Sequence, residues 1–487
     1  MKETKENRII LGKNALFNIL RVLFNLVLPV LVFPYVSRSL GPASLGMVDF
    51  ATAVVSYFLM FATMGIPVYG RIACAKVRNQ EQRLQKTVCE LMYIGLLLDV
   101  VTILALLLAV FLVPRFHAYR VLLLLNGLTV LVSAVSLEWL HGALERYQYI
   151  ALRTMGLKLL SVALIFLLVH SPKDAVLYTA INVLVQVLTA LMDLALVRKH
   201  VRFFPLKELN LRRHFTPVLM FFTSSVAVTI AAHTDTVMLN LISGEYHTGL
   251  YTFSARIKSM LLALMSAGLD VVIPRLSLAY HEGRHRDFRT LLRTVGLFTF
   301  VVACAMWAFF TAFSREAVNI LGSAAYESAA AIVMALVLSL PVLSFNFTLG
   351  IGVLHTIGRE RFYARTMLIS CLVNILANLL LIPRFQGVGA AAATLVSETV
   401  NLALYYRYSR DYLKDTFSHS RCLPILAAAV AAGALCYVGK AYLLPGQPLW
   451  QMLVFLIVYL IIYCPLVLLI SKDARQFVNT MLKERER

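Results

Sequence analysis

The sequence contains few charged residues for its length. Of its 487 residues, 14% are charged and 60% are hydrophobic. Soluble globular proteins have roughly 25% charged and about 45–50% apolar residues. So few charges cannot cover a surface exposed to water, which excludes an ordinary soluble domain.

Patterns typical of catalysis and metal binding are also scarce. The seven cysteines are scattered, mostly within apolar runs, and they form no C-x-x-C pair, so we expect neither a disulfide framework nor a metal site. There is no G-x-S-x-G nucleophile elbow and no P-loop. His141, His170 and His281 stand apart at expected helix ends or in loops. We therefore predict a protein that is not an enzyme and that needs no cofactor.

Long apolar runs are what the sequence has in excess. The runs 96–113, 121–137 and 452–470 are as long as the roughly 18 or more residues that cross a hydrocarbon core about 30 Å thick. The sequence predicts an all-α polytopic membrane protein with about fourteen transmembrane helices. A kink is expected at Pro341. The predicted spans lie near residues 15–37, 47–69, 91–113, 119–140, 152–169, 175–197, 217–242, 249–273, 292–313, 329–354, 363–382, 388–406, 423–444 and 449–470.

The positive charge of the chain follows the connections between spans. The chain has 45 Lys and Arg against 25 Asp and Glu, a net charge of +20. These basic residues recur between apolar runs instead of forming one patch, which argues against nucleic acid as a partner. Most fall in alternate loops, so the positive-inside rule places those loops and both chain ends in the cytoplasm. The start, residues 1–13, is interpreted as an uncleaved cytoplasmic tail. Dense inner clusters are Arg71, Lys76, Arg78, Arg83 and Lys86; Arg198, Lys199, Arg202, Lys207, Arg212 and Arg213; and Arg275, Arg284, Arg286, Arg289 and Arg293.

An internal repeat links the two halves of the chain. A shift of 203 residues places the second span on the eighth, with Gly46 on Gly249, Phe50 on Phe253 and Gly65 on Gly268. Six spans separate the copies, so both halves cross the membrane in the same sense, as in transporters with parallel repeats. We predict two pseudo-symmetric six-helix lobes, 1–207 and 208–420, joined by the basic loop 198–214. Two additional helices and a cytoplasmic tail occupy 421–487.

The first span carries a polar stripe. Asn14, Asn18, Arg21 and Asn25 are spaced by four, three and four residues, which places them on one helical face. A charge near the bilayer centre costs roughly 2.5–3.5 kcal/mol on insertion scales. The stripe is expected to face a water-filled interior. The alternative is that the asparagines bond neighbouring helices and that Arg21 pairs with a carboxylate.

The seventh and eighth spans are the other polar ones. Ser225, Thr229, His233, Thr236 and Asn240 share one face, with Asp235 beside them, and Tyr251, Ser254 and Lys258 share a face of the next span. Asp235 and Arg256 lie at matching depths and could form an ion pair, whereas Lys258 has no acid in sequence reach. Lys258 and Arg21 together predict a basic central cavity suited to an anion. The other buried acids are expected mostly to reach water or pair with loop arginines: Asp99, Asp193, Asp270, Glu138 and Glu398.

Several segments carry a resemblance to a known family. They are residues 12–35, the stretch Leu40-Gly41-Pro42-Ala43-Ser44-Leu45-Gly46, then 65–71, 137–145, 358–360 and 374–397. From about residue 10 to residue 410 the chain resembles the bacterial polysaccharide flippases of the Wzx type, in the superfamily shared with the MATE multidrug exporters.

The resemblance implies a multi-pass protein of the bacterial cytoplasmic membrane. Its two lobes would rock around a central cavity and carry an undecaprenyl-pyrophosphate-linked oligosaccharide from the inner to the outer leaflet, with H⁺ or Na⁺ as a coupling ion. Arg21, Arg256 and Lys258 would hold the pyrophosphate. From the polar faces of the first and seventh spans, Asn18, Asn25, His233 and Asp235 are also predicted to bind the substrate. The two additional spans resemble those of the peptidoglycan lipid II flippases.

Three other functions are weighed against this one. A MATE-type drug/cation antiporter would carry uncompensated acids in its cavity, whereas the predicted cavity is basic. A membrane glycosyltransferase or polysaccharide polymerase needs a large outer loop with catalytic charges, but the longest outer connection, 314–328, contains little besides Arg315, Glu316 and Glu327. A structural membrane protein would not need Arg21 and Lys258 within its spans.

Overall fold

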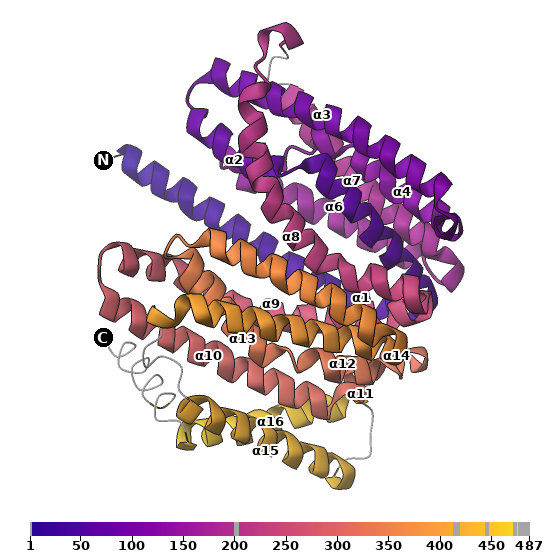
Figure 1. Ribbon diagram of the computed structural model, residues 1–487, viewed down its shortest axis with the longest axis vertical. Helices are drawn as coiled ribbons and strands as arrows, with labels where there is room; N and C mark the ends of the chain where they lie inside the picture. The colour runs from indigo at the N-terminus through magenta and orange to yellow at the C-terminus, as the bar shows by residue number, and fades with distance from the viewer. Residues whose placement is uncertain (1, 199–203, 413–418, 444–447, 471–474, 476–487) are drawn as a thin grey trace. The chain divides into compact units, whose positions relative to one another are not determined.

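The protein is described here by a computed structural model (Figure 1), which covers residues 2–198, 204–412, 419–443, 448–470 and 475. Within these ranges, the side chains of residues 2–23, 25, 26, 206, 224, 267–271, 419, 420, 441 and 443 lie outside the description. All regular secondary structure of the described chain is helical, and no strand occurs in it.

Sixteen α-helices follow one another along the described chain. They are α1 (Lys2–Thr63), α2 (Ile66–Val77), α3 (Glu81–Leu112), α4 (Arg120–Leu131), α5 (Glu138–Ala143), α6 (Tyr147–Leu168), α7 (Ala175–Arg198), α8 (Arg212–Ser243), α9 (Glu245–His281), α10 (His285–Ala312), α11 (Ser314–Leu321), α12 (Ala329–Val337), α13 (Leu340–Leu349), α14 (Glu360–Ser409), α15 (His419–Leu443) and α16 (Pro448–Ile470).

These helices account for the predicted fourteen spans. Among the described residues, eleven helical stretches are long and apolar enough to cross a membrane. Two of them consist of two helices each, because α1 is broken at Gly41 and α14 at Gln386. The 37-residue helix α9 supplies the remaining span. The prediction of an all-α polytopic membrane protein is confirmed.

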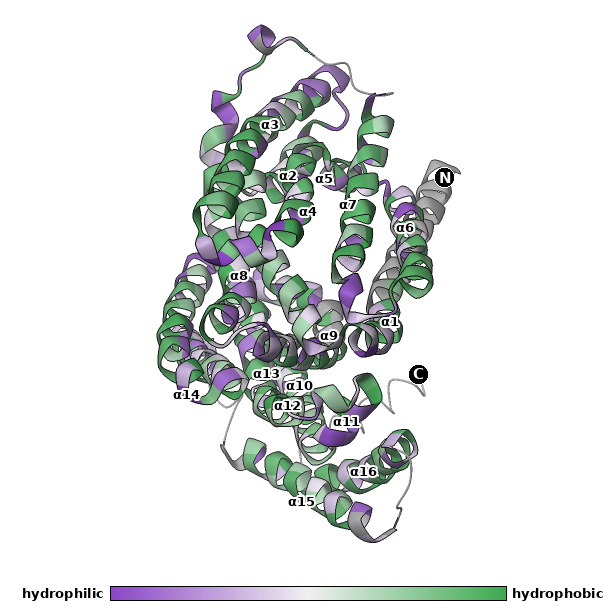
Figure 2. Cartoon of the chain, turned by 90° about the vertical axis from the view of Figure 1, so that its right-hand side faces the viewer, coloured by the Kyte–Doolittle hydropathy of each residue, from purple (hydrophilic) through white to green (hydrophobic). Residues whose placement is uncertain are grey.

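Apolar side chains cover the outer sides of these helices. On α3, Leu97, Val101, Leu104 and Leu108 are each more than half exposed, and Leu112 is 73% exposed. Figure 2 shows the resulting apolar colouring along α3, α4 and α7. Exposed leucine and valine on this scale are unfavourable in water, whereas they match the hydrocarbon core of a bilayer.

The backbone confirms the repeat. Gly41 and Gly244, which are 203 residues apart, both have positive φ, 71° and 84°, a conformation that glycine adopts without steric cost. Helices α5 and α13 begin directly after Leu137 and Ser339, one residue from the same offset. Phe50 and Phe253 are both fully buried, as equivalent positions should be. One difference stands out: α9 continues through Gly268, whereas α1 and α2 are separated at Met64 and Gly65.

Near the predicted kink at Pro341 the helix has a two-residue break, Leu338 and Ser339, at which φ and ψ stay helical. Helix α12 ends at Val337, and α13 begins at Leu340 with the proline in its first turn. A proline is tolerated there because the first backbone N–H groups of a helix have no partner within it. A π-helical turn, Gly350–His355, follows α13.

The chain divides into two compact units, residues 1–240 and 241–487. The core of unit 1 includes Phe50, Leu106 and Leu123 near the ends of α3 and α4, and Cys89, Leu91 and Trp139 around α2 and α5. In unit 2, α15 and α16 pack on α10 through a cluster that includes Phe309, Phe313, Tyr459 and Tyr463. The predicted lobe limits at residues 207 and 420 stay predictions.

Candidate functional site

The polar face predicted on the seventh span lies on α8, beside the second half of α1. The Tyr57 hydroxyl lies 3.1 Å from Oγ1 of Thr234, and the Tyr57 and His233 rings meet edge to face with centroids 6.3 Å apart. His233 is half-buried and lies within electrostatic reach of Asp49. Two helices of unit 1 therefore share a polar seam at the level of His233.

Further along α8, the polar side chains are buried. Asp235, Thr236 and Asn240 are each less than a tenth exposed. The Nδ2 amide of Asn240 has no hydrogen-bond partner among the described residues. A buried amide without a partner is unfavourable, so a water or ligand oxygen would be stabilised beside Asn240.

On α9, part of the predicted polar face is used for packing within unit 2. Ser254 is fully buried, and its hydroxyl donates to the carbonyl oxygens of Leu250, at 2.8 Å, and of Ala329 in α12, at 3.3 Å. Arg256 and Lys258 are half-buried and interact with neighbouring groups.

The first polar stripe lies on a continuous helix, since α1 is helical from Lys2. The side chains of Asn14, Asn18, Arg21 and Asn25 lie outside the described residues, so their orientation stays a prediction. The pairing of Asp235 with Arg256 also stays a prediction, because the two residues belong to different units.

A buried ionic network, which the spacing of the sequence did not predict, joins α5, α6 and α7. The Arg153 guanidinium donates to Asp193 and, at 2.9 Å, to Glu138. Nε2 of His141 lies 3.3 Å from the Asp193 carboxylate. Arg153, Asp193 and His141 are buried. Asp193 and Glu138 are therefore neutralised by an arginine within a helix, and not by the loop arginines that were expected.

A second network holds the start of α8 against α3. Glu90 accepts hydrogen bonds from the Asn210 backbone N–H at 2.8 Å, from Arg213, and from Nε2 of His214 at 2.7 Å. On the other side of the imidazole, Nδ1 lies 2.8 Å from the Tyr69 hydroxyl of α2. The segment before α8 is thus fixed to two helices of unit 1.

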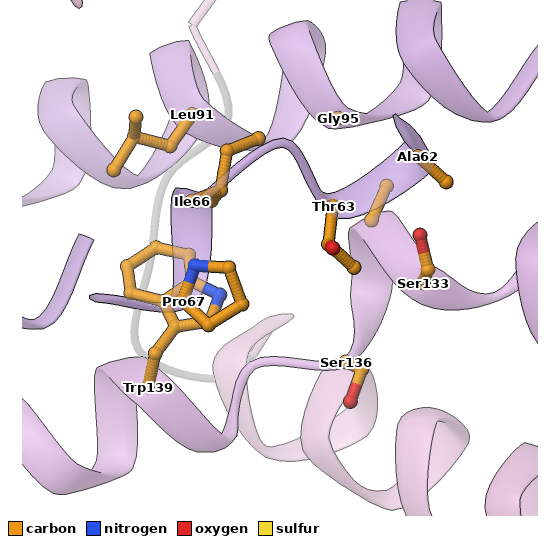
Figure 3. A pocket seen from close by; sticks show the side chains of 10 residues that line it. Ala62, Thr63, Ile66, Pro67, Leu91, Gly95, Ser133, Ser136 and Trp139 are labelled. Carbon is orange, nitrogen blue, oxygen red and sulfur yellow. The ribbon is translucent and has the colours of Figure 1, made fainter. Parts of the chain in front are cut away.

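Asp99 is buried without a basic partner among the described residues. It is 3% exposed, and it accepts hydrogen bonds from the Ser133 hydroxyl at 2.5 Å and from the Ala134 N–H at 2.9 Å. Ser133 and Ala134 also line a cavity of about 20 Å³, around which Thr63, Ser136 and Trp139 are arranged (Figure 3). The expectation that buried acids reach water or pair with arginine is wrong for Asp99.

The remaining predicted acids differ in their surroundings. Glu398 accepts a hydrogen bond from the Asn346 amide at 2.7 Å. The side chain of Asp270 lies outside the described residues.

The expectation that His281 stands apart is wrong, because His281–His285 matches H-E-x-x-H, which in zinc proteases places two histidines on one face of a helix. Here α9 ends at His281 and α10 begins at His285, with Gly283 at φ 72° between them. The two imidazoles therefore belong to different helices. No group of three His, Cys, Asp or Glu that could hold a metal occurs in the described part of the chain.

The family model described as polysaccharide biosynthesis protein matches residues 11–280, more than half of the chain. The chain belongs to this family. The match includes the polar face of α8, the Asp99 site and both ionic networks of unit 1. The resemblance seen in the sequence is thereby confirmed.

One relative, from Escherichia coli K12, carries the name "Putative O-antigen transporter". The two are 22% identical over 408 residues, which cover 83% of this chain and 98% of the relative. The inward closed structure of the lipid II flippase MurJ matches with a TM-score of 0.72 and 16% identity, over 97% of this chain and 100% of that one. An inward-facing MATE multidrug transporter matches with a TM-score of 0.62 and 16% identity, over 82% and 96%. These solved structures establish the fold.

Proposed function

We propose that the protein is a flippase that moves an undecaprenyl-pyrophosphate-linked oligosaccharide from the inner to the outer leaflet of the bacterial cytoplasmic membrane. The observation that carries the proposal is the match to the Escherichia coli relative named as an O-antigen transporter, over nearly the whole of that relative. The family assignment and the multi-pass fold support it. Both chain ends would lie in the cytoplasm, and the protein would act by alternating access and not as an enzyme.

The chemistry of the substrate explains the basic residues within the spans. A pyrophosphate leaves water to cross the membrane, and fixed positive charges in a wet cavity offset part of that cost. Arg21 would grip phosphate oxygens with two parallel hydrogen bonds, whereas Lys258 and Arg256 would add charge. Asn18, Asn25, His233 and Asp235 would complete the polar lining. H⁺ or Na⁺ would serve as the coupling ion.

The test is surface polysaccharide in a flippase-null strain, with protein level followed by immunoblot. We expect that Arg21→Ala or Lys258→Ala abolishes export while membrane insertion continues, and that Arg21→Lys retains part of the activity. Arg384→Ala, on an exposed arginine predicted to lie on the outer side, is the matched control and should export normally. Normal export by the Arg21→Ala, Lys258→Ala double variant would overturn the basic-cavity mechanism.

The fold shared with MATE transporters makes a drug/cation antiporter the second candidate. Expression in the flippase-null strain distinguishes the two candidates by the phenotype that the protein restores. A flippase restores surface polysaccharide without changing susceptibility to cationic drugs, whereas an antiporter raises drug resistance and leaves the polysaccharide absent.

A further inference from the structure

Asp99 occupies a position where a charge is unfavourable. It lies within the predicted span 91–113, on α3, and is 3% exposed. Its two hydrogen-bond donors, the Ser133 hydroxyl and the Ala134 N–H, are neutral. Two neutral donors do not replace the hydration of an ionised carboxylate, so the apolar surroundings favour a bound cation or proton.

Two other buried acids of unit 1 are compensated. Asp193 has Arg153, and Glu90 has Arg213 and His214. Asp99 forms no ion pair with any described residue, although α3 and the elements that pack on it carry many charges. The charged and histidine groups described there are Arg38, Asp49, Arg71, Lys76, Glu81, Arg83, Lys86, Glu90, Arg115, His117 and Arg120, with Arg212, Arg213 and His214 at the start of α8.

Asp99 also has a structural role, because it caps an interruption that unit 2 lacks. Ser133 and Ala134 belong to the interruption between α4 and α5, so Asp99 caps that break. The equivalent connection in unit 2, between α12 and α13, has only two residues, Leu338 and Ser339, and both keep helical φ and ψ. The positions equivalent to Asp99 there are Val302 and its neighbour Val301, both apolar. The long interruption and the acid therefore occur together in unit 1, and both are missing from the equivalent part of unit 2.

The cavity beside Asp99 offers polar groups to a small guest. Its volume of about 20 Å³ is room for one water molecule. It lies where two breaks of unit 1 meet, at Met64–Gly65 and at Ser133–Val135. Figure 3 shows the hydroxyl groups of Thr63, Ser133 and Ser136 around it. In transporters, broken helices of this kind commonly surround ion sites.

We propose that Asp99 is a proton-binding residue whose protonation drives the transport cycle, an inference that rests on the proposed flippase function. A proton from water on one side of the membrane adds to the carboxylate through the cavity beside Ser133. The protonated oxygen then donates to Ser133 Oγ, which reverses the direction of that hydrogen bond, while the other oxygen keeps the Ala134 N–H. Release to water on the opposite side returns the carboxylate.

Trp139 lines the same cavity and serves as the reporter. The chain has three tryptophans, so Trp307→Phe and Trp450→Phe leave Trp139 alone. Its emission is followed in the full-length protein in lipid nanodiscs from about pH 4 to about pH 9, which covers carboxyl groups in water and in apolar surroundings. We expect a titration that Asp99→Asn abolishes and that Asp99→Glu restores with a shifted midpoint.

Asp174→Asn is the matched control, because Asp174 also accepts hydrogen bonds from a serine hydroxyl and backbone N–H groups, but in a loop. It should leave the Trp139 titration unchanged. An unaltered titration in Asp99→Asn, or a response to Na⁺ at fixed pH and none to protons, would overturn the proposal. Should Asp99→Asn fail to fold, a silent Trp139 in Asp99→Glu would overturn it equally.

Export in the flippase-null strain tests the proton site separately from the proposed flippase function on which it rests. Wild-type protein that restores no polysaccharide contradicts the flippase function, whatever Trp139 reports. If wild-type protein restores the polysaccharide and the Asp99→Asn variant restores it equally well, the proton site is contradicted and the flippase function is not. We expect restoration by wild type and by Asp174→Asn, and at least a tenfold loss with Asp99→Asn at equal protein level, on the order of what 1.4 kcal/mol represents.

Discussion

The Glu90 carboxylate lies 2.7 Å from Nε2 of His214, a residue 124 positions further along the chain. The same carboxylate accepts a hydrogen bond from the Asn210 N–H, and the Tyr69 hydroxyl bonds the other ring nitrogen of His214, Nδ1. This contact fixes the chain around Asn210, directly before α8, in the region where the sequence places the connection between the two lobes. The connection therefore has a firm anchor on unit 1.

Removing this anchor should expose the connection to protease. Hydrogen bonds to a charged group are worth about 1.5–3 kcal/mol, so Glu90→Gln should raise local opening by roughly tenfold or more. The measurement is the rate of trypsin cleavage between α7 and α8 in purified protein. Glu145→Gln, which breaks the exposed Arg78–Glu145 ion pair, is the control and should not change that rate. If trypsin cleaves wild type, Glu90→Gln and Glu145→Gln at equal rates, Glu90 does not hold the connection.

The Arg153–Asp193 pair should dominate the stability of the α5–α7 region. Both side chains are buried, and removing one partner of a buried ion pair typically costs about 3–5 kcal/mol. Asp193→Asn should therefore lower the melting temperature clearly, and Arg153→Met combined with Asp193→Leu should lower it less than the single change. A thiol-reactive dye can follow unfolding, because Cys74, Cys89, Cys304, Cys371 and Cys436 are buried.

The exposed pair Arg78–Glu145 is the control for this second prediction. Surface ion pairs contribute about 0–1 kcal/mol, so Arg78→Gln should melt within a few degrees of wild type. If the double variant at Arg153 and Asp193 loses as much stability as the two single variants together, the two residues are not coupled.

The orientation in the membrane can be tested by thiol labelling in a cysteine-free background. Cysteine at Pro172 should react with an impermeant reagent in intact cells, because the positive-inside rule places that loop outside. Cysteine at Gln80 or His281 should react only after permeabilisation. All three positions are exposed, so burial does not obscure the result. The reverse pattern would invert the predicted topology.

The predicted ion pair between Asp235 and Arg256 calls for a double-mutant cycle. Asp235→Asn or Arg256→Gln alone would leave an uncompensated charge within the membrane, which is costly. The double variant should then export more polysaccharide than either single one. Impairment equal to the product of the two single effects would mean that the residues act independently.

Much of the fold could be predicted from local patterns. Apolar run length determines the number of spans, and loop charge indicates their orientation, because both depend on residues close together in the sequence. The repeat was visible in Phe50 and Phe253, and it extends to the pair Gly41 and Gly244, whose shared positive φ makes the same turn before the second and eighth spans. The break at Pro341 was signalled by the missing N–H of proline.

The sequence by itself thus determined that this protein is a helical, two-lobed membrane protein with polar faces on particular spans. Only the tertiary structure decided which buried charges are compensated. Asp193 and Arg153 are 40 positions apart, and Asp99 and Ser133 are 34 apart, so no helical periodicity connects them. The three acids Asp99, Asp193 and Glu138 looked alike in the sequence, because the cost of burying a carboxylate depends on the groups that folding brings within about 3–4 Å of it.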